Sequence, residues 1–281
     1  DIRNDFVNNR IDKLVDEVPF YSSGATGTDN TGIKHFWKRG TVKFVGSNVP
    51  TAFREFPAQR LVVDERDVCN PKNISYAVDR LAAAKELTGK DPMALELSSP
   101  TKPNRGIDAS FRMSDQKHWQ VWCSHCRDYV RLKWIGGVVR QTDEYLYELI
   151  DRKWRPDMGR DAFIHCADCG NIINRHDTNA KWIPMHPELS GECSGYHITK
   201  LFTHQTSIAA LWKIYHKALG NMSKLEHFHN SEMGEPFEGD ADSLSIKNLQ
   251  KLLEQLSTIY YNTSKNIVSD NIYDILKDLL Q

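Results

Sequence analysis

The chain has no long apolar stretch: none of its runs approaches the roughly 20 residues that span a membrane, and its first residues lack a signal-peptide pattern. Its 36 Lys and Arg nearly balance 37 Asp and Glu, giving a formal net charge of −1. This balance excludes a global positive field that would attract nucleic acid, although it leaves room for a local basic face. The chain begins at Asp1 without methionine, so we expect a fragment or a processed piece. These absences favour an intracellular protein without a membrane anchor.

Four of the six cysteines form two Cys-x-x-Cys pairs, Cys123 with Cys126 and Cys166 with Cys169, separated by 39 residues (166 − 126 − 1). The two thiolates of each pair can reach one ion, and four sulfurs complete the closed tetrahedral shell of a structural zinc site. A redox pair or two disulfides is the competing interpretation. The doubled spacing and the intracellular character favour zinc.

The residues around these pairs suit a zinc ribbon. Gly170 follows the second pair, where a tight turn is easiest without a Cβ. Trp134 and the dipeptide 172–173 lie where short strands would follow each turn. The other two cysteines, Cys69 and Cys193, fit no pair and are expected to be small buried residues.

The first hundred residues alternate between helical and extended patterns. A helix is predicted over 6–15 and another over 75–87, the latter with Ile74, Val78, Leu81 and Ala84 on one face and Gly89 as its stop. Strands are predicted over 41–45, 61–63 and 93–97. This alternation predicts an α/β fold with a largely parallel sheet, whose ligands sit at the carboxyl ends of its strands. Farther along, a helix over 207–219 carries an apolar stripe typical of the core.

Asp64 and Glu65 directly follow the apolar segment 61–63. A hydrophobic strand that ends in Asp-Glu is the Walker B arrangement of P-loop ATPases, in which the aspartate holds Mg²⁺ through water and the glutamate deprotonates the attacking water. Any buried strand can end in two acids, so the motif alone is a weak signal. The next strand ends in the hydroxyl-bearing residues Ser98, Ser99 and Thr101, which could sense the γ-phosphate; a Ser/Thr-rich turn closed by proline is the simpler interpretation.

The order of these segments resembles the large terminase subunit of tailed bacteriophages, the GpA type, over roughly residues 1 to 240. The resemblance rests on the order and spacing of several segments, none of which is decisive alone: 41–47 with 53–54, the Walker B segment 61–65, the segment 98–101, the two cysteine pairs, 195–201 and 228–236.

The resemblance implies an ATPase that packages double-stranded viral DNA, with ATP and magnesium as cofactors. It also implies the small terminase subunit and the procapsid portal as partners, homo-oligomerisation of the full-length protein, and the cytoplasm of the infected bacterial host as location.

Two parts of this family are missing from the sequence. No Gly-x-x-x-x-Gly-Lys-[Ser/Thr] precedes Walker B; the segment 27–34 comes nearest but lacks the lysine spacing and the hydroxyl. Without that loop the β- and γ-phosphates have no cradle. The family's nuclease (endonuclease) domain is absent as well. We therefore expect that the chain alone does not hydrolyse ATP.

Basic residues lie near both motifs. Arg54 and Arg60 precede Walker B and could contact phosphate, or could be ordinary surface arginines. Around the first cysteine pair, tryptophans interleave with cations, a pattern that could track a DNA backbone but equally fits a ribbon core with lysine stems lying along it: Trp119, Trp122, Trp134, Lys117, Arg127, Arg131 and Lys133.

Beyond residue 240 the pattern becomes that of a helical hairpin. Four of its residues match the nicotinamide-mononucleotide (NMN)-binding hairpin of NAD-dependent DNA ligases: Tyr260, Asp270, Tyr273 and Asp274. The match covers only about 20 residues and lacks an adenylation domain, so a hairpin that packs on the motor or on a partner is the favoured interpretation.

The predicted architecture is thus a partial P-loop ATPase (RecA-like) sheet with an inserted zinc ribbon and a C-terminal helical hairpin. Residues 1–115 form the C-terminal part of the ATPase domain, 116–180 the ribbon, 181–240 a return to the ATPase domain, and 241–281 the hairpin. The alternatives are a non-catalytic zinc-ribbon module that binds nucleic acid or protein, and a chimeric chain with a ligase-like tail.

Overall fold

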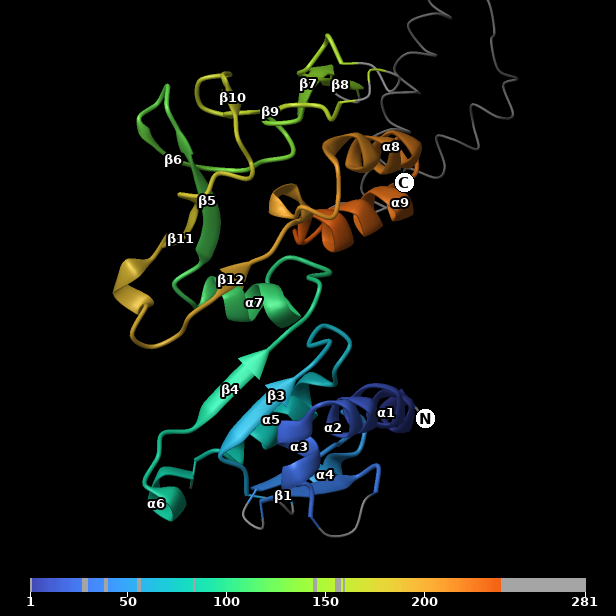
Figure 1. Cartoon of the computed structure of the whole chain (residues 1–281), viewed down its shortest axis with the longest axis vertical. Helices are drawn as coiled ribbons and strands as arrows, with labels where there is room; N and C mark the ends of the chain where they lie inside the picture. Colours follow the sequence, from blue (N-terminus) through green and yellow to red (C-terminus); the bar gives the residue numbers. More distant parts are fainter. Residues whose placement is uncertain are drawn as a thin grey trace, which may run out of the picture. The chain divides into compact units, whose positions relative to one another are not determined.

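The computed structural model describes residues 2–26, 30–37, 40–54, 57–82, 84–143, 146–154, 158 and 160–238. The chain divides into two compact units, residues 1–98 and a second unit that begins at Ser99 (Figure 1). Within the described ranges, no helix combines the length and the apolar character that crossing a membrane requires.

The first unit begins with consecutive helical segments: α1 (Ile2–Phe6), the π-helical η1 (Val7–Asp12), α2 (Lys13–Glu17) and α3 (Pro19–Gly24). The helix predicted over 6–15 lies inside this run. An antiparallel hairpin of β1 (Ile33–Phe36) and β2 (Gly40–Lys43) follows, then α4 (Pro50–Arg54). The strand predicted over 41–45 therefore ends two residues early.

A parallel pair, β3 (Arg60–Val63) and β4 (Met93–Glu96), carries the Walker B segment. It is connected through α5 (Pro71–Asp79) and α6 (Ala84–Thr88). The single helix predicted over 75–87 is wrong, because α5 ends at Asp79 and α6 begins only at Ala84. The first helix also starts earlier than predicted, since the side chain of Asn70 accepts hydrogen bonds from the amides of Lys72 and Asn73. Gly89, with φ +71°, ends α6 as predicted.

The prediction of a largely parallel sheet is not confirmed. Within the described residues of the first unit, β3 and β4 pair only with each other, and β1 and β2 form a separate hairpin. One face of the β3–β4 pair is open to solvent: Val62, Met93, Leu95 and Leu97 are exposed. Val78 of α5 is exposed too, although Ile74 and Leu81, which were predicted to share its helix face, are buried. The fold is mixed α/β with small sheets.

The second unit is built around β5 (Lys117–Cys123), which follows α7 (Gly106–Arg112). Antiparallel neighbours of β5 are β6 (Asp128–Arg131) and β11 (Lys181–Pro184), and β12 (Tyr196–His197) pairs with it in parallel. Two further hairpins join β7 (Val139–Asp143) to β8 (Leu146–Leu149) and β9 (Ile164–His165) to β10 (Ile172–Ile173). Short 3-10 turns η2 (Pro187–Leu189) and η3 (Lys200–Phe202) lie on either side of β12.

Helices α8 (Ile208–Ala218) and α9 (Met222–His227) with η4 (Phe228–Met233) close the second unit. The predicted helix over 207–219 is confirmed: Ser207 caps α8, and Ile208, Leu211 and Tyr215 are buried. The ring of Trp134 lies 5.2 Å from that of Tyr215 and 4.9 Å from that of Phe228, centroid to centroid. One core thus joins the helices to the cysteine-bearing hairpins.

The predicted ribbon (116–180) and the segment after it share a sheet, because β5 pairs with both β11 and β12. The compact units separate after Ser98 rather than near residue 115. The domain boundaries at 115, 180 and 240 stay predictions, and the tail over 241–281 lies outside the described residues.

Candidate functional site

The four paired cysteines converge. Their sulfur atoms all lie within 4.8 Å of one another, with 3.8 Å between the Sγ atoms of Cys123 and Cys169 and 3.7 Å between those of Cys126 and Cys166. A Zn–S bond of about 2.3 Å places the sulfurs of a regular tetrahedron about 3.8 Å apart. A disulfide would need about 2.05 Å, and all six cysteines are free. The donor set therefore fits a closed tetrahedral metal site, and the disulfide interpretation does not describe this structure.

Both cysteine turns are built alike. The amide of Arg127 donates to the carbonyl of Cys123 at 2.8 Å, and the amide of Gly170 donates to the carbonyl of Cys166 at 2.8 Å. Both donors have left-handed backbones, φ +57° at Arg127 and +73° at Gly170. Each turn connects two antiparallel strands, β5 with β6 and β9 with β10. The expected strand at 172–173 is confirmed, whereas Trp134 lies beyond β6, buried in the core.

The environments of the thiols differ. The side-chain amide of Asn171 donates to Sγ of Cys169 at 3.5 Å and lowers the pKa of that thiol to about 6. Burial raises the pKa of Cys166, and the neighbouring sulfurs, Cys169 first, raise the pKa of Cys126. Within the described part of the chain, these cysteines are the only group of three or more His, Cys, Asp or Glu side chains that converges on one point. His125 and His165 are not members of it, as expected.

The Walker B segment lies at the carboxyl end of β3, with Asp64 and Glu65 both exposed. The parallel register continues past the strands, because the amide of Leu97 donates to the carbonyl of Val63 at 2.9 Å and that of Arg66 donates to Leu97 at 3.0 Å. The hydroxyl of Ser98 then accepts from the amide of Asp67 at 3.2 Å. The structure therefore brings the Asp64–Glu65 turn and Ser98 together at one edge.

One family comparison bears on this arrangement. The model of the phage terminase large subunit gpA ATPase domain matches residues 1–185, about two thirds of the chain. The chain belongs to this family. No curated protein and no solved structure matches the chain. The match ends before the tail, so the DNA-ligase-like interpretation of residues 260–274 gains no support.

An ion pair that sequence reasoning missed stabilises the Walker B edge of this terminase domain. The guanidinium of Arg66 lies 3.3 Å from the carboxylate of Glu96, and both side chains are largely buried. Glu96 ends β4, and Arg66 follows the Asp64–Glu65 turn, so the pair ties the two carboxyl ends together. A buried pair at this position could be predicted only once the register of the parallel strands is known.

Several predicted residues are not brought to this edge. Arg60 starts β3 and donates to Sδ of Met93 at 3.4 Å, which places it about 13 Å of strand away from Asp64 at roughly 3.3 Å per residue. The guanidinium of Arg54 lies 4.8 Å from the ring centroid of Tyr76. Thr101 belongs to the second unit, where its carbonyl accepts from the amide of Phe237 at 3.2 Å. Lys34, from the segment nearest to a P-loop, is buried and lies 2.6 Å from Asp12.

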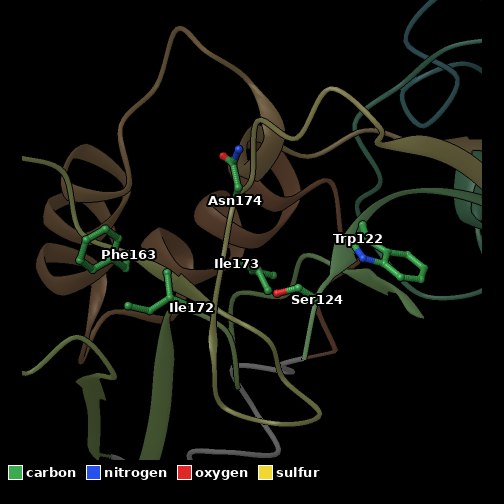
Figure 2. Close-up of a pocket in the computed structure, with 6 residues that line it drawn as sticks. All are labelled: Trp122, Ser124, Phe163, Ile172, Ile173 and Asn174. Atoms are coloured by element: carbon green, nitrogen blue, oxygen red, sulfur yellow. The ribbon is translucent and has the colours of Figure 1, made fainter. Parts of the chain in front are cut away.

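The tryptophans around the cysteine cluster of this terminase chain divide into two kinds. Trp134 is core, and Trp119 packs against Trp182 and Phe202 at centroid distances of 5.4 and 5.9 Å. Trp122 is 41% exposed. It borders an open hollow of 450 Å³, in which Phe163 and Ile172 lie on one side and Trp122 on the other (Figure 2).

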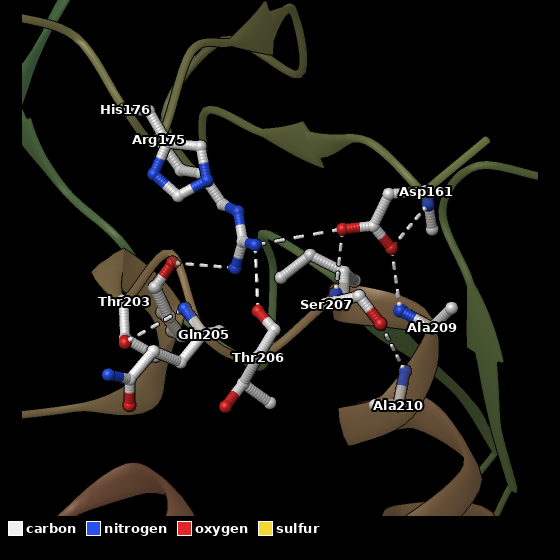
Figure 3. A network of polar contacts seen from close by, with 12 residues as sticks. Asp161, Arg175, His176, Thr203, Gln205, Thr206, Ser207, Ala209 and Ala210 are labelled. Atoms are coloured by element: carbon white, nitrogen blue, oxygen red, sulfur yellow. Dashed lines mark hydrogen bonds and ion pairs between the residues drawn. The ribbon is translucent and has the colours of Figure 1, made fainter.

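A polar network joins the segments on either side of the β9–β10 hairpin to the start of α8 (Figure 3). The carboxylate of Asp161 accepts from the amides of Ile208 at 2.9 Å and Ala209 at 2.8 Å. Arg175 lies 3.7 Å from that carboxylate and donates to the carbonyl of Thr206 at 2.7 Å. The sequence carried no signal for this network, because its partners are up to 48 residues apart.

Proposed function

We propose that this chain contributes the magnesium-binding and water-activating part of the ATP site of a phage DNA-packaging motor. Family membership over residues 1–185 supports an ATPase that packages DNA. The observation that carries the assignment to residues is the meeting of the Asp64–Glu65 turn with Ser98 at the carboxyl ends of two parallel strands. Ligands of such sheets bind at that edge.

In the proposed mechanism, Asp64 would hold the magnesium ion and Glu65 would accept the proton of the attacking water. Bound magnesium supplies positive charge that neutralises the phosphates. Both carboxylates are exposed and are therefore accessible to nucleotide.

The bond from the Asp67 amide to the Ser98 hydroxyl offers a route from hydrolysis to movement. A displacement of the Asp64–Glu65 turn on phosphate release would pull on the end of β4. We propose that Ser98, together with Ser99 and Thr101, transmits this displacement to the residues that follow Thr101.

The four cysteines are proposed to hold one structural zinc ion. Sulfur–sulfur distances of 3.7 and 3.8 Å support this assignment. A closed four-sulfur shell leaves no open position for catalysis, so the ion would hold the β5–β6 and β9–β10 turns together.

Family membership also supports the remaining assignments. We propose double-stranded viral DNA as the substrate that is moved, the small terminase subunit and the procapsid portal as partners, and the host cytoplasm as the place of action.

The experiment that tests the catalytic assignment uses a longer polypeptide that carries a P-loop upstream of Asp1. Glu65→Gln should keep ATP binding but lower turnover by about 100-fold or more, since an amide cannot accept the proton. Glu86→Gln is the matched control, because Glu86 is an exposed glutamate of α6 in the same unit. Wild-type turnover in Glu65→Gln would refute the role of Glu65.

A further inference from the structure

The sheet of the second unit has a face that the ATP site does not use. Side chains alternate along a strand, so Gln120 and Trp122 of β5 share one face. Their cross-strand partners on that face are Tyr129 and Arg131 of β6 and Lys181 of β11. Toward the start of β5 the face is covered: His118 is buried, with the Phe111 ring of α7 5.6 Å away. At the other end Trp122 is exposed.

The exposed indole of Trp122 is held in place by its neighbours. Tyr129 packs on it at a centroid distance of 5.3 Å and an interplanar angle of 71°. The Tyr129 ring is itself fixed, since its hydroxyl donates to the carbonyl of Asn179 at 3.3 Å and the Lys181 ammonium lies 4.0 Å from its centroid. The Lys181 ammonium covers one face of the tyrosine ring, whereas the indole of Trp122 is 41% exposed, so Trp122 is the ring on which a base can stack.

The charge on this face is positive. Among the strand residues of β5, β6 and β11, all of which the structure describes, the face carries Arg131 and Lys181 and no carboxylate. Asp128 pairs with Cys123 and so points to the opposite face. Exposed Arg127 lies at the turn between β5 and β6.

The nearest carboxylates come from loops and already have partners. Asp177 accepts from the amides of Trp122 at 3.4 Å and Asn179 at 3.0 Å. Glu235 lies 3.6 Å from His229 and also interacts with the charge of Arg131, so the positive charge toward Trp122 comes from Lys181 and Arg127.

We propose that this face binds an unpaired DNA strand. One base stacks on Trp122, and Lys181 and Arg127 contact the phosphates on either side of it. A rigid exposed aromatic ring between cations is the arrangement that binds single strands, because every base has a flat face to stack. In a duplex those faces are covered by neighbouring base pairs. This inference goes beyond the proposed motor, whose substrate is duplex DNA, and it uses only residues of the second unit.

The test measures fluorescence anisotropy of a labelled oligothymidine of about 16 nucleotides, titrated with the zinc-loaded chain, with a duplex of equal length in parallel. We expect tighter binding of the single strand. Trp122→Leu should weaken it by about 5- to 150-fold, the range for loss of one stacked base, whereas Trp122→Phe should retain most of the affinity. Trp37→Leu is the matched control, because Trp37 is 47% exposed but belongs to the first unit.

A second pair of variants tests the phosphate contact. Lys181→Ala should reduce the dependence of binding on salt, and Lys213→Ala, an exposed lysine of α8, should not. Equal affinity of Trp122→Leu and wild type, a preference for duplex, or no saturable binding would each overturn the proposal. None of these outcomes depends on ATP turnover, so failure here and failure of the ATPase assignment are separate results.

Discussion

Replacing Asp161 with alanine tests whether the segment that leads into the β9–β10 hairpin and helix α8 form one cooperative structure. Asp161 follows β8 and precedes β9, yet its carboxylate accepts the first two amides of α8, those of Ile208 and Ala209. The hydroxyl of Ser207 accepts the third, from Ala210 at 3.0 Å. Two backbone amides at the start of α8 thus donate to a carboxylate that lies more than 40 residues away in the sequence.

The expected cost follows from these contacts. Hydrogen bonds to a charged acceptor contribute about 1.5–3 kcal/mol each. The Asp161 side chain is 34% exposed, so water replaces part of what is lost, and we expect Asp161→Ala to lower the free energy of unfolding by about 2–4 kcal/mol. Asp161→Asn keeps one oxygen acceptor and should lower the free energy of unfolding by less than Asp161→Ala does. Ser207→Ala, which removes one neutral cap from the same helix, should cost about 1 kcal/mol.

Urea unfolding of the zinc-loaded chain, followed by circular dichroism and tryptophan fluorescence, measures these differences at constant m value. An Asp161→Ala variant that is no less stable than Ser207→Ala would refute the reasoning, because the carboxylate would then contribute no more than an ordinary cap.

Elemental analysis should find one zinc per chain, lost in Cys166→Ser and retained in Cys193→Ser, whose thiol is exposed and unpaired with the cluster; a folded, metal-free wild type contradicts the assignment. Burial, followed by the charges nearby, lowers the pKa of His118 from 6.5 to about 3. Below pH 6.5 the folded state then binds fewer protons at His118 than the unfolded state, so the contribution of this residue to stability is complete above pH 6.5 and falls by up to about 1.4 kcal/mol per pH unit between pH 6.5 and about 3; an unchanged pH slope in His118→Gln would contradict this account. Gly170→Ala should cost about 1–2 kcal/mol through its positive φ, and Gly191→Ala, with equally open space, close to nothing; equal effects in thermal melts would contradict the backbone argument.

The hydrogen bonds of His118 and His197 define which ring nitrogens carry protons when both rings are neutral. Nε2 of His197 lies 3.0 Å from the carbonyl of Met233 and must donate to it, which leaves Nδ1 of His197 as an acceptor. Nδ1 of His118 donates to that atom at 3.2 Å. A proton added to either ring would have to enter a site that already contains the Arg131 guanidinium.

The cysteine turns were predictable because their geometry is local. A Cys-x-x-Cys spacing with a following residue in a left-handed backbone defines the turn, and Gly170 signals it in the sequence. The equivalent Arg127 carries no such signal, since arginine seldom has a positive φ. The burial expected for Cys193 is wrong, because the thiol lies in the exposed connection between η2 and β12.

The sheet was harder to predict, because pairing is a non-local property. An apolar segment that ends in Asp64 and Glu65 indicated a strand and its carboxyl end. The segment does not indicate how many strands pair with it. A largely parallel sheet was therefore expected, whereas the described residues form a two-stranded pair. The start of α5 was readable in Asn70 and Pro71, a cap followed by proline at the first helical position.

Contacts between residues that are far apart in the chain could not be predicted from the sequence. Asp161 reaches α8, and Arg66 pairs with Glu96 from the next strand. Nothing in the spacing of these residues distinguishes them from other charged residues of the chain. Only the assembled fold places their charges at a helix start and at a strand edge.

The central claim, a phage packaging ATPase with Asp64 at its magnesium site, is tested most directly by the initial rate of ATP hydrolysis of a longer polypeptide that carries a P-loop upstream of Asp1. Rates are measured across a magnesium titration, with and without linear duplex DNA. We predict turnover that duplex DNA stimulates, and an Asp64→Asn variant that needs more magnesium to reach half of its maximal rate. Asp79→Asn, an exposed aspartate of α5, should behave as wild type. An Asp64→Asn variant with the wild-type magnesium dependence, or turnover that is indifferent to DNA, would contradict the account.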